Sequence, residues 1–68
     1  MIIITKITPE TLGNEGFTLV HRGNVSYFEK GEIRVIYVDV NWHLCDIDGN
    51  IGNTYLLSIE QIYEEVSR

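Results

Sequence analysis

The segment Ile33–Val40 constrains the fold more than any other part of the sequence, because its alternate positions are apolar on both sides. Side chains along a strand point alternately to opposite faces of a sheet. The two alternate sets are Ile33, Val35, Tyr37 and Asp39, and Arg34, Ile36, Val38 and Val40. Each set holds three apolar or aromatic residues, a pattern typical of a strand that is covered on both faces. We therefore expect this segment at the centre of a β-sheet.

Other β-prone segments surround this central strand. We expect strands at Ile2–Ile7, Phe17–Arg22, Val25–Glu29, Trp42–Ile47 and Ile51–Leu57. The connections between strands are short and rich in turn residues, at Gly23-Asn24, Lys30-Gly31, Asn41 and Asp48-Gly49-Asn50. Asp48-Gly49 suits the positive φ values of a type I′ turn, and Gly52-Asn53 interrupts the last strand. Short connections of this kind predict an antiparallel meander of five or six strands.

Two helix signals flank the strands. Thr8-Pro9-Glu10 has the residue types of a helix start and predicts a short N-terminal helical turn. Ser58 and Gln61 match a capping box. Apolar residues then follow at helical spacing, at Ile59, Ile62, Tyr63 and Val66. A helix of about nine residues is unstable alone, so we expect it to pack on one face of the sheet. The predicted fold class is α+β.

Length and charge bound the kind of protein. The chain has 68 residues, of which 44% are hydrophobic, so we expect a single domain over residues 1–68. Ten acidic residues against five basic ones give a net charge of −5. This balance argues against sequence-independent nucleic-acid binding, which depends on Lys and Arg. The apolar opening Met1–Ile4 is too short for a signal peptide or a membrane span. We therefore expect a cytoplasmic protein that binds neither nucleic acid nor membrane.

His43 and Cys45 are the first candidates for catalysis, because residues two apart in a strand share a face. A nucleophilic cysteine needs a neighbouring base and a further group that orients that base. The alternative is that Cys45 acts as a small buried hydrophobe, which is the common role of a free cysteine. His21 lies far upstream, so the three residues lack the spacing of a zinc site. We expect a buried, slowly reacting Cys45, and no catalytic residue, metal or cofactor.

Asp46, Asp48 and Asn50 alternate as in the first half of a calcium loop. That loop then needs a glycine at its sixth position and a glutamate at its twelfth, where this sequence has Ile51 and Leu57. We therefore interpret the acidic residues here as part of a turn.

Two groups of residues are candidates for contact with a partner. Glu60, Glu64 and Glu65 lie opposite the apolar stripe of the C-terminal helix, where they would attract a basic partner. A solvated helix face explains the same three residues. Trp42 and Tyr27 offer the aromatic area that anchors interfaces, and filling the core is their alternative role.

These observations favour a small acidic protein–protein interaction module. It would bind and block a partner protein, as an immunity-type or phage-encoded inhibitor does. The alternative is a small-ligand-binding homo-oligomer with an aromatic-lined pocket between subunits, formed by Tyr27, Tyr37 and Trp42. An enzyme that uses His21 or His43 as an acid–base group ranks last, so we expect no enzyme.

The apolar surface of the predicted sheet indicates self-association. A helix of nine residues is about 13 Å long, enough to cover part of one sheet face. Large uncovered apolar patches are rare on monomers. A barrel that closes on its own strands would supply the missing cover, and so would a symmetric partner packed sheet against sheet. We favour the partner and expect a homo-oligomer.

Overall fold

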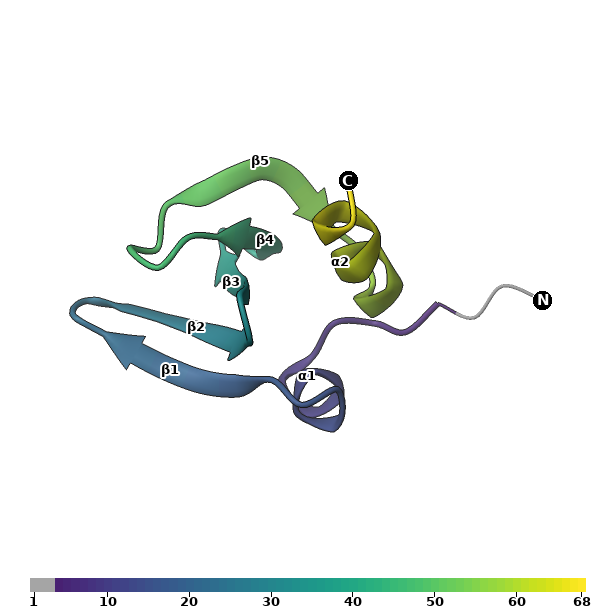
Figure 1. The fold of residues 1–68 in the computed structure, drawn as a ribbon, viewed down its shortest axis with the longest axis horizontal. Coiled ribbons are helices and arrows are strands. Elements are labelled where there is room, and N and C mark those ends of the chain that lie inside the picture. The colour runs from purple at the N-terminus through teal and green to yellow at the C-terminus, as the bar shows by residue number, and fades with distance from the viewer. Residues whose placement is uncertain (1–3) are drawn as a thin grey trace.

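A computed structural model describes residues 4–68, which form a five-stranded sheet and two helices (Figure 1). The elements are α1 (Pro9–Asn14), β1 (Thr18–Arg22), β2 (Val25–Lys30), β3 (Ile33–Val38), β4 (Asn41–Cys45), β5 (Ile51–Leu56) and α2 (Ile59–Val66). The strands lie in the order β1-β2-β3-β4-β5, and each pairs antiparallel with the next. The predicted α+β meander is therefore confirmed.

The predicted strand at Ile2–Ile7 is wrong for residues 4–7, and its first two residues lie outside the described part of the chain. Residues 4–7 form an arm that passes between the two helices (Figure 1). The Ile59 N–H donates to the Thr5 carbonyl at 2.8 Å, and the Thr5 N–H donates to Glu60 Oε1 at 2.7 Å. Because the first N–H groups of a helix have no acceptor inside that helix, the arm bonds to α2 instead of extending the sheet.

The central position predicted for Ile33–Val40 is confirmed, since β3 is the third of five strands. Val35 and Ile36 are both buried although they point to opposite faces. The strand ends at Val38, two residues earlier than predicted, because Asp39 and Val40 form the turn to β4.

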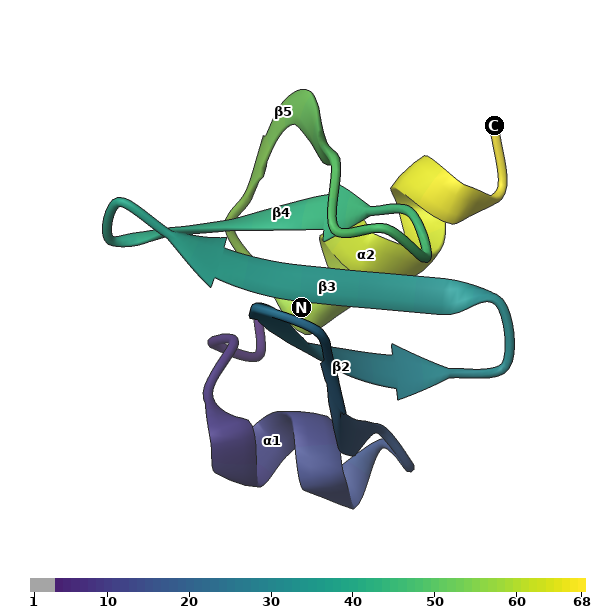
Figure 2. The same ribbon diagram turned by 90° about the vertical axis from the view of Figure 1, so that its left-hand side faces the viewer.

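The main core lies between one face of the sheet and the two helices. Figure 2 shows α2 behind β3 and β4. The buried residues of this core are Ile7, Leu12, Phe17, Val35, Leu56, Ile59 and Ile62. Lys30 Nζ donates to Tyr63 Oη at 2.8 Å, which in turn donates to Glu15 Oε1 at 3.0 Å. This chain of hydrogen bonds ties β2 to both helices.

A second, smaller cluster lies on the opposite face of the sheet. Strand pairing places Tyr27, Ile36 and His43 there, and all three are buried. The β4–β5 loop covers this face, since Tyr27 Oη donates to the Ile47 carbonyl at 3.1 Å. A Cβ on Gly49 would lie 2.9 Å from Val25 Cγ1, so the loop and β2 are in close contact. The curled sheet therefore covers part of its second face without a helix.

The type I′ turn predicted at Asp48-Gly49 is wrong, because only Gly49 has a positive φ there. The loop is longer, and the Asp46 carboxylate organises it. Asp46 Oδ1 accepts from the N–H groups of Asp48 and Asn50, each at 2.9 Å. These bonds lower the pKa of Asp46, with the Asn50 N–H as the largest cause.

The predicted interruption of β5 appears as a register shift, since His43 pairs with Tyr55 but Cys45 pairs with Ile51.

The C-terminal helix begins as predicted, with one change in its capping. Ser58 Oγ accepts from the Gln61 N–H at 3.1 Å. Gln61 Oε1 accepts from the Leu57 N–H at 2.8 Å, so its reciprocal bond goes to the residue before the cap. Ile59 and Ile62 are buried, whereas Val66 is 45% exposed, so the buried stripe is shorter than predicted.

Candidate functional site

Three tight turns connect the first four strands, and they differ in sequence. Gly23 and Gly31 open two of them with φ values of +61° and +60°, where glycine meets no steric penalty. The third turn, between β3 and β4, has φ values of +51° at Asp39 and +59° at Val40. This pair of positive values matches a type I′ turn, which favours Asn and Gly.

Val40 is the strained residue of that turn. A β-branched side chain in the left-handed region is a true outlier and costs about 1–3 kcal/mol. Val40 is also 81% exposed, so core packing does not explain a valine here. Strain of this kind concentrates at binding and catalytic sites. The tip of the β3–β4 hairpin is therefore a candidate site.

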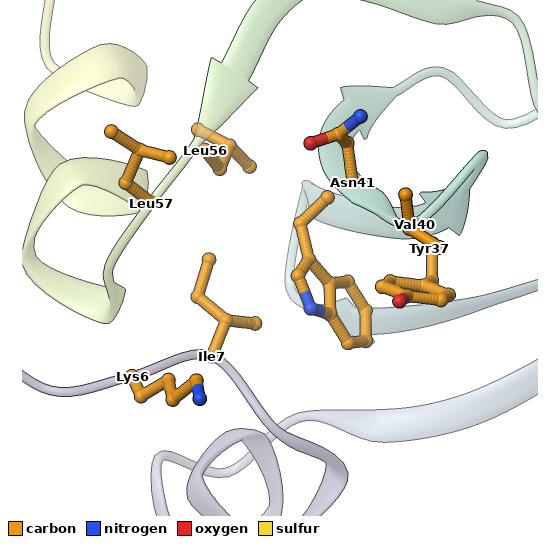
Figure 3. A pocket seen from close by; sticks show the side chains of 8 residues that line it. Lys6, Ile7, Tyr37, Val40, Asn41, Leu56 and Leu57 are labelled. Atoms are coloured by element: carbon orange, nitrogen blue, oxygen red, sulfur yellow. The ribbon is translucent and has the colours of Figure 1, made fainter.

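A hollow of about 270 Å³ lies beside this tip (Figure 3), and we call it the hairpin groove. It is lined by Lys6, Ile7, Tyr37, Val40, Asn41, Trp42, Leu56 and Leu57. Figure 3 shows Leu57 on one side of the hollow and Tyr37 and Val40 on the other. Ile7 and Leu56 are buried and form the floor, whereas Tyr37 and Leu57 are exposed by 54% and 75%. The groove thus has a buried apolar floor and an exposed apolar rim.

Aromatic packing fixes one wall of the hairpin groove. Tyr37 and Trp42 are paired across β3 and β4, with ring centroids 5.0 Å apart at 57°. Trp42 also packs edge-on against Phe28 at 5.9 Å, which joins it to the main core. Trp42 is thereby held in place, and Tyr37 keeps about half of its surface free for a ligand or partner.

Two polar side chains border the hairpin groove. Asn41 Nδ2 donates to the Asp39 carbonyl at 3.0 Å, so the turn itself orients this amide. The backbone carbonyl of Lys6 accepts from Thr11 Oγ1 at 2.7 Å. Within residues 4–68 the Lys6 ammonium has no ion pair. The groove therefore offers one cation and one amide beside its apolar lining.

A second hollow runs along the exposed side of α2, and we call it the helix groove. It is lined by Ile4, Leu57, Ser58, Glu60, Gln61, Glu64, Glu65 and Arg68. The Thr5 N–H that bonds to Glu60 lowers the pKa of this carboxyl. Arg68 Nε lies 3.6 Å from Glu65 Oε2. Leu57 lines both grooves, which therefore adjoin at this residue.

The structure separates the residues singled out in the sequence. Glu60, Glu64 and Glu65 line the helix groove, and Trp42 lines the hairpin groove. Tyr27 is only 1% exposed and lies on the other face of the sheet, so its side chain is not available to a partner.

Sequence reasoning missed two rim residues of the hairpin groove. Val40 was assigned to the last position of the central strand, and Leu57 to the end of another. Asp39-Val40 is not a recognisable turn sequence, so no local signal predicts that Val40 is a turn residue.

The residues considered for catalysis do not converge. His43 is 5% exposed and packs edge-on against Tyr55, and within residues 4–68 its Nδ1 has no hydrogen-bond partner. Cys45 is half-buried, and desolvation is the main cause that raises its pKa to about 11. The thiol therefore stays protonated at neutral pH and is a poor nucleophile. His21 lies on the face of the sheet opposite to that of His43, where the Nδ1 of His21 is 2.6 Å from Ser26 Oγ.

The described residues bring together no group of three or more His, Cys, Asp or Glu side chains that could hold a metal ion. Across the same part of the chain, neither helix has the length and apolar character needed to cross a membrane. No family model, curated protein or solved structure matches this sequence.

Proposed function

We propose that this chain is a protein–protein interaction module that binds its partner through the hairpin groove. The observation that carries the proposal is Val40, which combines a positive φ of +59° with 81% exposure. In the free protein this residue lowers stability and buries almost no apolar area. Its side chain would bury that area only when a partner covers it.

The composition of the groove supports a protein partner. Trp and Tyr dominate the energetics of interfaces, and Trp42 and Tyr37 stand next to Val40. Small-molecule pockets are usually about 300–1,000 Å³. The hairpin groove, at about 270 Å³, suits one apolar side chain presented by another protein.

We further propose that binding blocks the partner. A module of this kind acts by covering a functional surface, as an immunity-type or phage-encoded inhibitor does. Such action requires a preformed surface and no chemical step of its own, and the buried floor formed by Ile7 and Leu56 supports a preformed surface.

The test is affinity capture from the source organism with three forms of the chain. The forms are the wild type, Val40→Asn and the control Leu19→Gln, which alters an apolar residue that is 48% exposed on β1. Asn tolerates the left-handed region, so the first variant should fold. We expect a stoichiometric partner with the wild type and Leu19→Gln that is lost with Val40→Asn. Equal capture by all three forms would contradict the proposal.

The second candidate is a small-ligand-binding homo-oligomer, which the placement of Tyr37 and Trp42 in one groove favours. It requires a second copy of the chain to complete the pocket, and it predicts a co-purifying small molecule in native mass spectrometry. Light scattering after gel filtration tests the oligomer. A mass near 7.8 kDa at micromolar concentrations would exclude it.

A further inference from the structure

We infer that the partner presents an apolar side chain with Lys or Arg on one side of it, and that this segment binds across both grooves in one orientation. The inference rests on the proposed function and names the class of partner. Three features carry it: the junction of the grooves at Leu57, the acidic residues of α2, and the position of Lys6.

The two grooves adjoin at Leu57. Leu57 lines both hollows and is 75% exposed, and Ile4, which is 73% exposed, lies in the helix groove beside it. An extended segment whose apolar side chain fills the hairpin groove would therefore continue over Leu57. Its next residues would then lie along the exposed side of α2.

The helix groove favours basic residues in that part of the segment. Within residues 4–68, Glu64 has no ion pair, whereas Glu65 is paired with Arg68 and Glu60 accepts the Thr5 N–H. Glu60 and Glu64 are four residues apart on one helix, where like charges repel each other. A cation bound between them would relieve this repulsion. The net charge of −5 would also attract a basic partner over a longer range.

Lys6 sets the orientation. It borders the hairpin groove, while the three glutamates border the helix groove. A basic residue placed at the Lys6 end would meet an unpaired ammonium group, and the reversed segment would lose its contacts with Glu64. Charges arranged in this way fix the register of a bound segment and exclude the reverse one.

The test uses a random peptide library displayed on phage and selected on the immobilised wild-type chain. Binders that also bind Val40→Asn are removed, so the remaining peptides depend on the hairpin groove. We expect these peptides to share an apolar residue with Lys or Arg on one constant side. The selected peptide is then synthesised and its Kd is measured by fluorescence anisotropy.

Matched charge reversals complete the test. Glu64→Lys should raise the Kd about three- to tenfold, the size of a partly exposed ion pair that becomes repulsive. Glu32→Lys makes the same charge change at an exposed residue of the β2–β3 turn that lines neither groove, and should change the Kd less than about twofold. Circular dichroism checks that both variants remain folded.

The outcomes separate the inference from the proposed function. Peptides that depend on Val40 but show no basic bias would overturn the inference and leave the interaction module standing. Equal effects of Glu64→Lys and Glu32→Lys would do the same, because they would show a general charge effect only. A library that yields no Val40-dependent peptide would overturn both.

Discussion

The β2–β3 turn and the β3–β4 turn each join two strands of one sheet through two residues. They differ in the residue type that adopts a positive φ. Gly31 enters the left-handed region without steric cost, and a Cβ there would meet nothing within 4 Å. Val40 enters the same region with a branched side chain that is 81% exposed. The first turn serves only the path of the chain. The second turn lowers the stability of the fold and places an apolar side chain at the edge of a groove.

Removing a core residue sets the scale for this comparison. Ile62 is fully buried between α2 and the sheet, so Ile62→Ala should lower the free energy of unfolding by about 2–5 kcal/mol. A small domain has only about 5 kcal/mol to lose, so we expect a largely unfolded or poorly soluble protein. Thermal denaturation followed by circular dichroism gives the answer. An unchanged melting temperature would mean that α2 is not docked on the sheet.

Making the first turn resemble the second measures the strain directly. Gly31→Val places a branched residue at a φ of +60° with no steric contact beyond the backbone. We expect a loss of about 1–3 kcal/mol in the free energy of unfolding, measured by urea denaturation. If stability does not change, then a positive φ costs nothing in this chain, and the argument from Val40 fails.

Acid should distinguish the β4–β5 loop from the β1–β2 turn. Hydrogen bonds lower the folded-state pKa of Asp46 below its usual 3.8 and that of Glu60 below 4.5. Below pH 4.5 the unfolded chain therefore binds more protons than the folded one, so the stabilisation from these two carboxylates is lost as the pH falls through their folded pKa values. The β1–β2 turn, Gly23-Asn24, contains no carboxylate and so has no such hydrogen bonds to lose.

Amide chemical shifts during a pH titration would show this difference. We expect the Asp48 and Asn50 amides to shift as the Asp46 carboxylate that accepts from them is protonated, while the amides of Gly23 and Asn24 change little over the same pH range. Asp46→Asn should remove the part of these shifts that comes from Asp46. Parallel shifts in both regions would point to global unfolding in place of local release.

Much of the fold could be predicted from the sequence because it depends on local patterns. The two-sided apolar pattern of Ile33–Val40 identified the central strand, and helical spacing from Ile59 identified α2. The N-terminal arm was assigned to a strand because its β-branched residues favour one. Both backbone hydrogen bonds of Thr5, however, go to α2, more than fifty residues away. Competition of this kind between local preference and distant hydrogen bonds is not visible in a short window.

The candidate site was predicted only in part, for a related reason. Glu60, Glu64 and Glu65 share a helix face, so their spacing places them together. The hairpin groove combines the arm, the β3–β4 hairpin and the end of β5, and no local pattern joins these segments. Tyr27 and Tyr37 have similar sequence surroundings, and only the sheet register and the covering loop bury one and expose the other.

The most direct test of the central claim is a pair of measurements on Val40→Asn. Asn is favoured in type I′ turns, so the free energy of unfolding measured in urea should rise by roughly 1 kcal/mol. Affinity for a peptide selected on the wild-type chain alone, without removal of the binders of Val40→Asn, should fall by about tenfold, because Asn removes apolar area that the peptide would cover. Stability and binding would then move in opposite directions. If Val40→Asn lowers stability, or binds the peptide as tightly as the wild type, the claim that Val40 is strained for the sake of a partner is contradicted.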